Sequence, residues 1–159
     1  MERSGEQGST PGRADLPVFI GKYDRSLDPK GRLVLPSNYR RPFEDTGGVL
    51  AKWDRCLALW TTDKYGDVME QLNEKVRAGE ADDDVARVFQ SSAAEVQLDS
   101  QGRFVITEEQ RGYAGITREV AVIGQTTRVE IWSDTQYDQV ERAVGPEAVS
   151  SELRRLRIV

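Results

Sequence analysis

Short apolar runs, bounded by turn residues, set the pattern of this chain. Runs such as Cys56–Trp60 and Arg128–Trp132 are rich in β-branched and aromatic residues, which is typical of β-strands. Each follows a similar run after a short polar turn. The pattern therefore predicts two hairpins, Val49–Trp53 with Cys56–Trp60 and Val120–Gly124 with Arg128–Trp132.

The elements around these hairpins are predicted in the same order twice. Two strands and a short helix precede each hairpin, and a longer helix follows it. These elements are Phe19–Asp24, Arg32–Leu35, Ser37–Phe43 and Thr62–Arg77 in the first copy, and Glu95–Leu98, Arg103–Ile106, Glu108–Ala114 and Ser133–Val144 in the second. One further helix, Asp83–Ala94, follows a polar linker around Gly79–Asp84. The order indicates an α+β fold of two ββαββα repeats.

The duplication also extends to the residues themselves. Leu27–Arg32 reads LDPKGR, and Leu98–Arg103 reads LDSQGR. With one inserted residue, CLALWTTDKY aligns with RVEIWSDTQY. At about 45–50 residues, one copy alone would form only a marginal core. We therefore expect the two copies to share strands around one common core.

The repeats divide the chain into five predicted segments. Residues 18–66 and 93–137 are the repeats, residues 67–92 are linker helices, and residues 138–159 are a C-terminal helix and tail. Residues 1–17 are rich in Gly, Ser, Pro and charged residues, which is typical of a disordered tail.

The repeated motif is predicted to be a turn. Its first copy has Asp at the first position, Pro at the second and Gly at the fourth, as type I turns do. Glycine there supplies the positive φ that closes a hairpin with a bulge. The turn-forming residues are Asp28, Gly31, Asp99 and Gly102. The turn tips carry Lys30 and Gln101, and the turn exits carry Arg32 and Arg103.

The residues alone leave two interpretations of these arginines open. Arg32 can pair with Asp28, and Arg103 with Asp99, and such an exposed pair contributes only about 0–1 kcal/mol. Alternatively, the two turns project together and present the arginines to a phosphate or a base edge. Both can hold at once, because an aspartate can orient an arginine that contacts a ligand.

The residue types exclude several classes of function. The chain has no histidine, which excludes Ser-His-Asp triads, Cys-His pairs and zinc sites made of His and Cys. The one cysteine, Cys56, lies among apolar neighbours, so we expect it to be buried and reduced in a cytoplasmic protein. No apolar run is long enough to cross a membrane. We expect no enzymatic activity, cofactor, metal, small-molecule substrate or membrane partner.

Charge is unevenly distributed along the chain. The net charge is −5, which by itself disfavours a polyanion as partner. However, Val18–Phe43 holds six basic and two acidic residues, whereas Asp67–Asp84 holds seven acidic and two basic ones. The chain is therefore charge-polarised, and its basic part is suited to an anionic partner.

These residues resemble a known family. VFIGKYDRSLDPKGRLVLPSNYR resembles the start of the MraZ proteins, which are bacterial transcriptional regulators, and AAEVQLDSQGRFVITEEQRGYAGI resembles their second half. The resemblance runs from Val18 to Tyr137. Four features depart from the family pattern. The second turn tip is Ser100-Gln101, Thr107 stands where a proline is usual, residues 1–17 are extra to the usual family start, and Asp63–Ser92 matches only loosely. Thr107 with Glu108–Gln110 predicts a helix capping box instead.

The resemblance implies both a fold and a function. MraZ proteins hold two AbrB-like repeats in one pseudo-two-fold, β-barrel-like core and assemble into rings. They bind direct repeats in double-stranded DNA and regulate, as repressors, their own operon and the division and cell-wall gene cluster. For this chain the resemblance implies a cytoplasmic, nucleoid-associated regulator that binds DNA through Lys30, Arg32, Gln101 and Arg103.

Two other functions stay open. An antitoxin-like protein-interaction module of the same fold class would wrap a partner with Pro146–Val159, a segment that could equally be a frayed amphipathic helix packed on its own subunit or a neighbour. A carboxylate-based enzyme would hold a divalent cation with Asp82–Asp84. The start of a helix, where aspartate is favoured, explains these three residues more simply.

Overall fold

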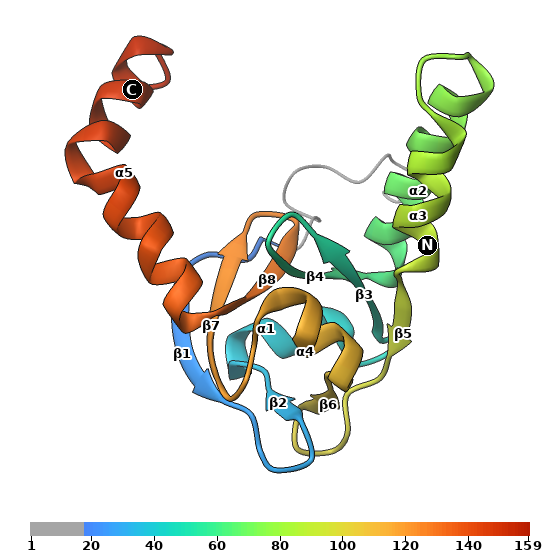
Figure 1. Cartoon of the computed structure of the whole chain (residues 1–159), viewed down its shortest axis with the longest axis vertical. Helices are drawn as coiled ribbons and strands as arrows, with labels where there is room; N and C mark the ends of the chain where they lie inside the picture. Colours follow the sequence, from blue (N-terminus) through green and yellow to red (C-terminus); the bar gives the residue numbers. More distant parts are fainter. Residues whose placement is uncertain (1–17) are drawn as a thin grey trace, which may run out of the picture.

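The computed structural model describes residues 18–159, so the predicted disordered tail at residues 1–17 lies outside the described part. The described elements are β1 (Lys22–Ser26), β2 (Arg32–Val34), α1 (Ser37–Arg40), the 3₁₀ turn η3 (Arg41–Phe43), β3 (Gly48–Trp53), β4 (Cys56–Thr61), α2 (Thr62–Arg77), α3 (Asp83–Ser91), β5 (Ala94–Val96), β6 (Arg103–Val105), α4 (Glu108–Ala114), β7 (Glu119–Gln125), β8 (Arg128–Ser133) and α5 (Asp134–Arg155). The fold is α+β, as predicted, with the ββαββα order present twice (Figure 1).

Strand exchange joins the two repeats. β1 of the first repeat pairs antiparallel with β7 of the second, and β5 of the second pairs with β3 of the first. The result is a six-stranded sheet in the order β1-β7-β8-β4-β3-β5, and β2 and β6 form a separate two-stranded sheet. Each motif turn therefore connects strands of two different sheets. Its own backbone is nevertheless closed as predicted, since the N–H of Asp28 donates to the carbonyl of Arg32 at 3.1 Å and the N–H of Asp99 donates to that of Arg103 at 2.9 Å.

The pairing follows a pseudo-two-fold axis. Leu33 lies opposite Phe104 in the β2–β6 pair, and these two residues occupy equivalent positions of the two repeats. In the central β4–β8 pair, Ala58 lies opposite Glu130, which are again equivalent. The prediction that two repeats share strands around one core is confirmed.

One hydrophobic core lies between the two sheets. The central strands β4 and β8 are covered on both faces, and every residue of β4 is buried. The core side chains of the large sheet include Leu50, Leu57, Leu59, Val120, Val122, Val129 and Ile131. The small sheet and the segments that follow it contribute Leu33, Leu35, Tyr39, Phe43, Phe104 and Ile106. Burial of this apolar surface is the main force that holds the motif turns in place.

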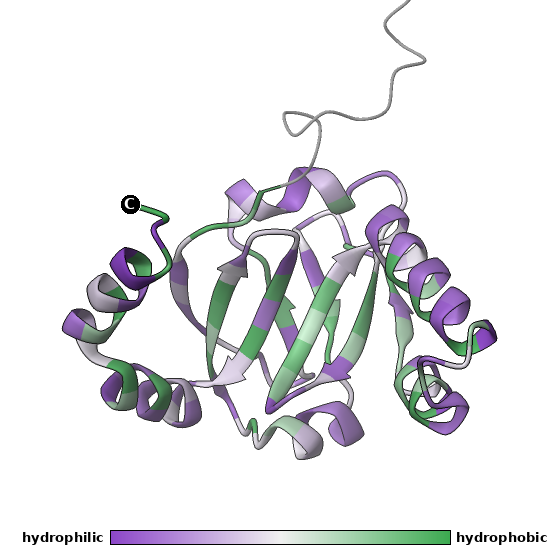
Figure 2. Cartoon of the chain, turned by 90° about the horizontal axis from the view of Figure 1, so that it is seen from above, coloured by the Kyte–Doolittle hydropathy of each residue, from purple (hydrophilic) through white to green (hydrophobic). Residues whose placement is uncertain are grey.

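The longer helices cover the outer face of the large sheet in two separate patches. Tyr65 of α2 and Phe89 of α3 pack over Ala58 and Trp60. On the second patch, α5 packs over a cluster that includes the fully buried Cys56. Seen from above, the sheet lies between the two groups of helices (Figure 2). Cys56 is thus buried as predicted, and desolvation raises the pKa of its thiol.

Local signals fix several helix boundaries. Thr107 and Gln110 form the predicted capping box at the start of α4, and Gly115, with φ of 68°, ends that helix. The side chain of Asp82 accepts hydrogen bonds from the backbone N–H groups of Asp84 and Val85. Asp82 therefore caps α3, in agreement with the simpler interpretation of the acidic run.

Most element boundaries lie within three residues of the prediction; the helix predicted over Asp83–Ala94, for example, ends at Ser91, and Ala94 begins β5. Two differences have a visible cause. β1 begins at Lys22 rather than at Phe19, because Gly21, with φ of 100°, bends the chain and leaves Phe19 with only an isolated bridge to Thr126. The last helix continues to Arg155, well beyond Val144. It does so across a kink at Gly145, where φ is 71° and ψ is 157°.

The motif turns and the long helices lie at opposite ends of the molecule. Figure 1 shows both turns side by side at the lower end, and the helices α2, α3 and α5 projecting from the upper end. Within residues 18–159, the helices are too short or too polar to cross a membrane.

Candidate nucleic-acid interface

One aspartate builds each motif turn. In the first turn, the backbone N–H of Gly31 donates to the carbonyl of Asp28 at 2.9 Å. The carboxylate oxygen Oδ1 of Asp28 accepts from the backbone N–H groups of Lys30 and Arg32, both at 2.9 Å. Asp99 makes the same set of bonds in the second turn. A single carboxylate therefore fixes the turn tip and the backbone of the arginine that follows.

The second carboxylate oxygen holds the arginine side chain. Nε of Arg32 donates to Oδ2 of Asp28 at 2.5 Å, and Nε of Arg103 donates to Oδ2 of Asp99 at 2.8 Å. In the described part of the chain, neither arginine uses its terminal Nη atoms in a hydrogen bond. The ion pair of the first interpretation is therefore present. It occupies Nε and leaves the Nη donors available, as the second interpretation requires.

The carboxylates of both turns are held in their charged form. The backbone N–H groups of Arg32 and Arg103 lower the pKa of Asp28 and Asp99 below the ordinary value of 3.8, and the arginine side chains act in the same direction. The aspartates therefore stay ionised, and the turns stay organised, throughout the neutral pH range.

An arginine of the opposite repeat braces each turn. Gly31 and Gly102 have φ of 78° and 77°, which confirms the predicted positive φ. A Cβ on Gly31 would collide with the side chain of Arg111, and a Cβ on Gly102 would collide with that of Arg40. Nε of Arg40 donates to the carbonyl of Leu35 at 2.8 Å. Nη1 of Arg111 donates to the carbonyl of Ile106, which is the equivalent residue of the second repeat. Arg40 and Arg111 thus lock the two turns together.

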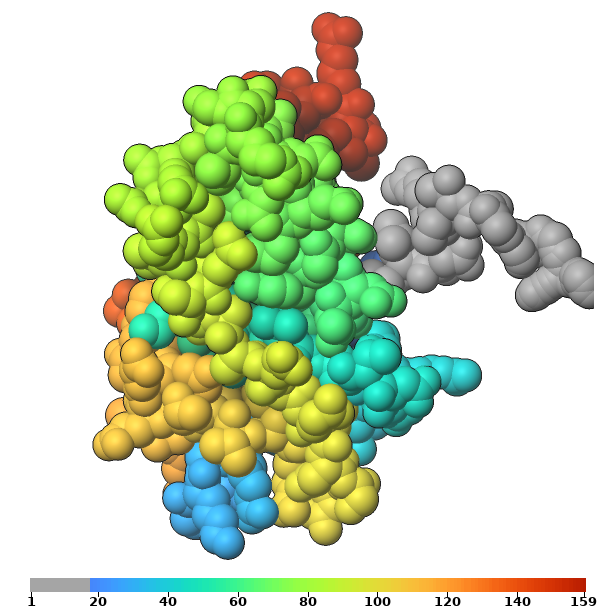
Figure 3. Space-filling view, turned by 90° about the vertical axis from the view of Figure 1, so that its right-hand side faces the viewer, coloured from blue at the N-terminus to red at the C-terminus, as the bar shows by residue number. Residues whose placement is uncertain are grey.

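The small sheet presents both motif arginines on one exposed face. Arg32 lies opposite Val105, and Arg103 lies opposite Val34, while the residue between them on each strand points into the core. The exposed face of the small sheet therefore carries two arginines and two valines. We call this face, together with the two turn tips, the turn face. Figure 3 shows the two turns, blue and yellow, projecting side by side from this end.

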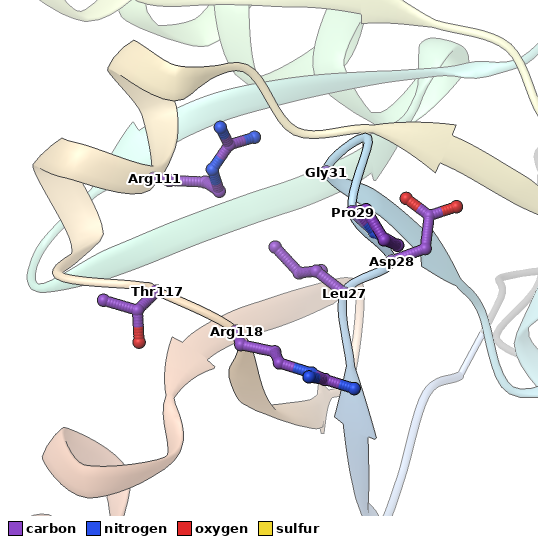
Figure 4. Close-up of a pocket in the computed structure, with 7 residues that line it drawn as sticks. All are labelled: Leu27, Asp28, Pro29, Gly31, Arg111, Thr117 and Arg118. Carbon is purple, nitrogen blue, oxygen red and sulfur yellow. The ribbon is translucent and has the colours of Figure 1, made fainter.

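The first half of the turn face is the more basic half. Its tip carries Lys30, whereas the second tip carries Gln101. A cleft of about 340 Å³ beside the first turn is lined by Arg111 and Arg118, with Asp28 at its edge (Figure 4). The position equivalent to Arg118 in the other repeat is Thr46. The two repeats thus have the same backbone arrangement around the turns, but the residues on their surfaces differ in charge.

The candidate residues that were predicted from the motif lie together. Lys30 and Gln101 lie at the turn tips, and Arg32 and Arg103 lie on the exposed face of the small sheet. Their contact with DNA stays a prediction. Arg118 was missed, because it belongs to no motif. It reaches the first turn through strand exchange, where the backbone N–H of Leu27 donates to the carbonyl of Arg118 at 2.9 Å.

Comparison with known families agrees with this geometry. The family described as "MraZ protein, putative antitoxin-like" matches the chain twice in succession, over residues 18–88 and residues 89–155. The two matches correspond to the two repeats that exchange strands. This family is one of regulator-like proteins rather than enzymes, and its matches span most of the sequence. On this evidence, the chain belongs to the MraZ family.

Proposed function

We propose that this protein is a sequence-specific DNA-binding transcriptional regulator that contacts duplex DNA with its turn face. The observation that carries the proposal is the placement of Arg32 and Arg103 on one face of the β2–β6 pair. An aspartate orients each of them, and their Nη atoms make no hydrogen bond within residues 18–159. An oriented guanidinium loses little side-chain freedom on binding, and its planar fork matches phosphate oxygens and the edge of guanine.

The four candidate residues take different roles in this proposal. Arg32 and Arg103 read base edges or clamp phosphates. Lys30 contributes a phosphate contact from the first tip. Gln101 suits the edge of adenine, which a glutamine contacts through one donor and one acceptor. A pseudo-symmetric face with unequal tips therefore reads a DNA site whose two halves differ.

The charge distribution supports the same orientation on DNA. The acidic helices α2 and α3 lie at the end of the molecule away from the turn face (Figure 1). The acidic stretch Asp67–Asp84 therefore lies at a distance from the duplex. Because one copy offers only a few phosphate contacts, we propose that several copies act together on DNA, where linked sites raise affinity by roughly 10²–10⁴-fold.

The proposal extends to assembly and target, as the family resemblance implies. Copies of the chain form a ring, and the ring engages direct repeats upstream of the protein's own operon in the division and cell-wall gene cluster, where it represses transcription. The protein acts in the cytoplasm, on the nucleoid. Double-stranded DNA and further copies of this chain are its partners.

Capture of genomic DNA tests this function directly. Purified protein is incubated with sheared genomic fragments, and the bound fragments are sequenced. We expect enrichment of a few loci that carry repeated short elements, one of them upstream of the protein's own gene. Recovery of fragments in proportion to their abundance would contradict sequence-specific recognition.

A mobility-shift series tests the requirement for several copies. Probes with one and with three repeats are compared across salt concentrations. We expect the three-repeat probe to bind more tightly and the affinity of both to fall steeply with salt. Equal affinity for the two probes would contradict the proposed multivalent binding.

The antitoxin-like alternative has an observation of its own. The C-terminal part of α5 and the residues after it expose Val149, Leu156 and Ile158, and the matching family is described as antitoxin-like. A module of this kind would bind a protein partner through α5 and leave genomic DNA uncaptured. The capture experiment therefore discriminates between the two functions.

A further inference from the structure

We infer that Val149–Val159, which holds the last turns of α5 and the residues after it and which we call the docking segment, docks into a cleft beside α3 of a second copy of this chain. This inference deepens the proposed self-assembly and does not depend on DNA binding. Beyond the kink at Gly145, Val149, Leu153 and Leu156 recur at helical spacing and form one apolar stripe. Such a stripe on a water-exposed helix is typical of a contact surface.

The end of this helix is ordered by its own capping motif. The backbone N–H of Ile158 donates to the carbonyl of Leu153 at 3.0 Å, and that of Arg157 donates to the carbonyl of Arg154 at 3.0 Å. Arg157 has φ of 56°. These are the bonds of a Schellman motif, which folds Ile158 back over the last helical turn. Leu156 and Ile158 are nevertheless 49% and 64% exposed, so an organised apolar end lacks a partner within the described chain.

The cleft has the complementary character. It encloses about 600 Å³ where the β3–β4 turn, α3 and α4 meet. Its apolar lining consists of Trp53, Val85, Val88, Phe89 and Tyr113. Val85 and Val88 are 65% and 69% exposed, although they lie next to each other on one face of α3. The cleft therefore offers apolar surface to an amphipathic helix.

Charge distinguishes a second copy from other occupants. The rim of the cleft carries Asp54, Asp82 and Asp84, with Lys52 the one basic residue among its lining. The docking segment carries Arg154, Arg155 and Arg157, with Glu152 its one acidic residue after Val149. Each apolar surface is thus bordered by charge of the opposite sign, which favours docking in one orientation.

The two surfaces cannot meet within one chain. α5 packs on β7 and β8, whereas β3, α3 and α4 form the cleft. Figure 1 shows α5 and α3 on opposite sides of the molecule, and Figure 3 shows α3 and α4 together on the side away from α5. A contact between different surfaces of successive copies is head-to-tail and closes into a ring if the rotation permits. The turn face lies outside this contact and stays free for DNA.

Cross-linking between copies tests the inference. One chain carries Val88→Cys in the cleft and a co-expressed chain carries Leu156→Cys on the docking segment. The native Cys56 is fully buried and does not interfere. A short bis-maleimide should convert the mixed sample to a covalent dimer. It should convert a single chain that carries both Val88→Cys and Leu156→Cys to a ladder of covalent multimers. Glu70→Cys on α2, paired with Leu156→Cys, is the matched control and should give no product.

Three results would overturn the inference. The first is the absence of a cross-linked product from the mixed pair. The second is a dimer from Val88→Cys alone, which would indicate a symmetric contact. The third is a monomeric mass for the wild-type protein by light scattering. A second variant, Arg154→Glu with Arg157→Glu, should lose the assembled mass and retain the circular-dichroism spectrum. Retention of the assembled mass would contradict the charge complementarity. Because no DNA is present, failure of the DNA-binding proposal would leave all of these results unchanged.

Discussion

At the scale of single residues, Asp28 and Asp99 each have two tasks. One oxygen of the carboxylate accepts the backbone N–H groups that shape the turn, and the other orients the arginine at the turn exit. The shape of the turn and the orientation of the arginine side chain are therefore two consequences of one arrangement, and contact of that arginine with DNA stays a prediction. The Asp-x-x-Gly-Arg spacing exists because the carboxylate must reach both the turn tip and the fourth residue after it.

The lowered pKa of these aspartates predicts an acid-labile turn. The unfolded chain binds protons near the ordinary value of 3.8, and the folded chain binds them only at lower pH. The stabilisation is therefore complete above 3.8 and is lost as the pH falls through the folded-state pKa. We expect Asp28→Asn with Asp99→Asn to reduce the loss of unfolding free energy between about pH 6 and about pH 3. Urea titrations at both values measure it, and an unchanged loss would argue against this linkage.

At the scale of elements, strand exchange makes each turn depend on the other repeat. The backbone N–H of Leu35, directly after β2, donates to the carbonyl of Gly102. The backbone N–H of Ile106, directly after β6, donates to the carbonyl of Gly31. Arg40 and Arg111 then pack against the glycines of the opposite turn. The two turns consequently form one rigid unit, although they are far apart in the sequence.

Replacement of a turn glycine should therefore damage that unit. In Gly102→Ala the new Cβ must adopt positive φ and displace Arg40, and we expect a loss of roughly 1–3 kcal/mol in unfolding free energy. Gly66→Ala is the control, since it lies inside α2 and its new Cβ would meet no described atom within 4 Å outside its neighbours and the backbone of its own helix. It should stabilise by about 0.5–1 kcal/mol. Denaturant unfolding measures both, and equal effects of the two variants would refute the strain at Gly102.

Local and non-local features of the fold differ in how far the sequence predicts them. The turns, the hairpins and the capping box at Thr107 depend on neighbouring residues, and these were predicted correctly. The pairing of β1 with β7 depends on packing between residues about a hundred positions apart, which no local pattern encodes. For the same reason, Arg118 beside the first turn became visible only in the structure. The kink at Gly145 is a local feature, since Gly145 has positive φ and directly precedes Pro146, but it was not predicted.

At the scale of the whole molecule, near-symmetric backbones carry unequal charges. The two halves of the turn face superimpose by the pseudo-two-fold axis, but Lys30 and Arg118 lie on the first half and Gln101 and Thr46 occupy the equivalent positions. A palindromic site would be read equally by both halves. If the turn face binds DNA as proposed, its unequal halves favour one orientation of each copy, as direct repeats would require.

This asymmetry predicts unequal effects of two single substitutions. If Arg118 contacts a phosphate, Arg118→Ala should make the slope of log affinity against log salt shallower by about 0.9 for each copy bound. Thr46→Arg adds a cation to the other half and should steepen the slope by a similar amount. Fluorescence anisotropy with a captured duplex measures both slopes. A slope unaffected by Arg118→Ala would remove the cleft beside the first turn from the proposed interface.

The central claim is that the two motif arginines form the DNA contact. Arg32→Ala with Arg103→Ala removes both guanidinium groups from the turn face, and Arg77→Ala with Arg142→Ala is a control with the same change of charge on α2 and α5. The most direct measurement is duplex affinity by mobility shift, with assembled mass by light scattering on the same samples. The account predicts that the motif variant loses affinity by at least roughly tenfold, since a good arginine contact contributes about 1–3 kcal/mol. It also predicts unchanged mass for the motif variant and near-normal binding for the control. Normal DNA binding by the motif variant, or loss of its assembled mass, would contradict the account.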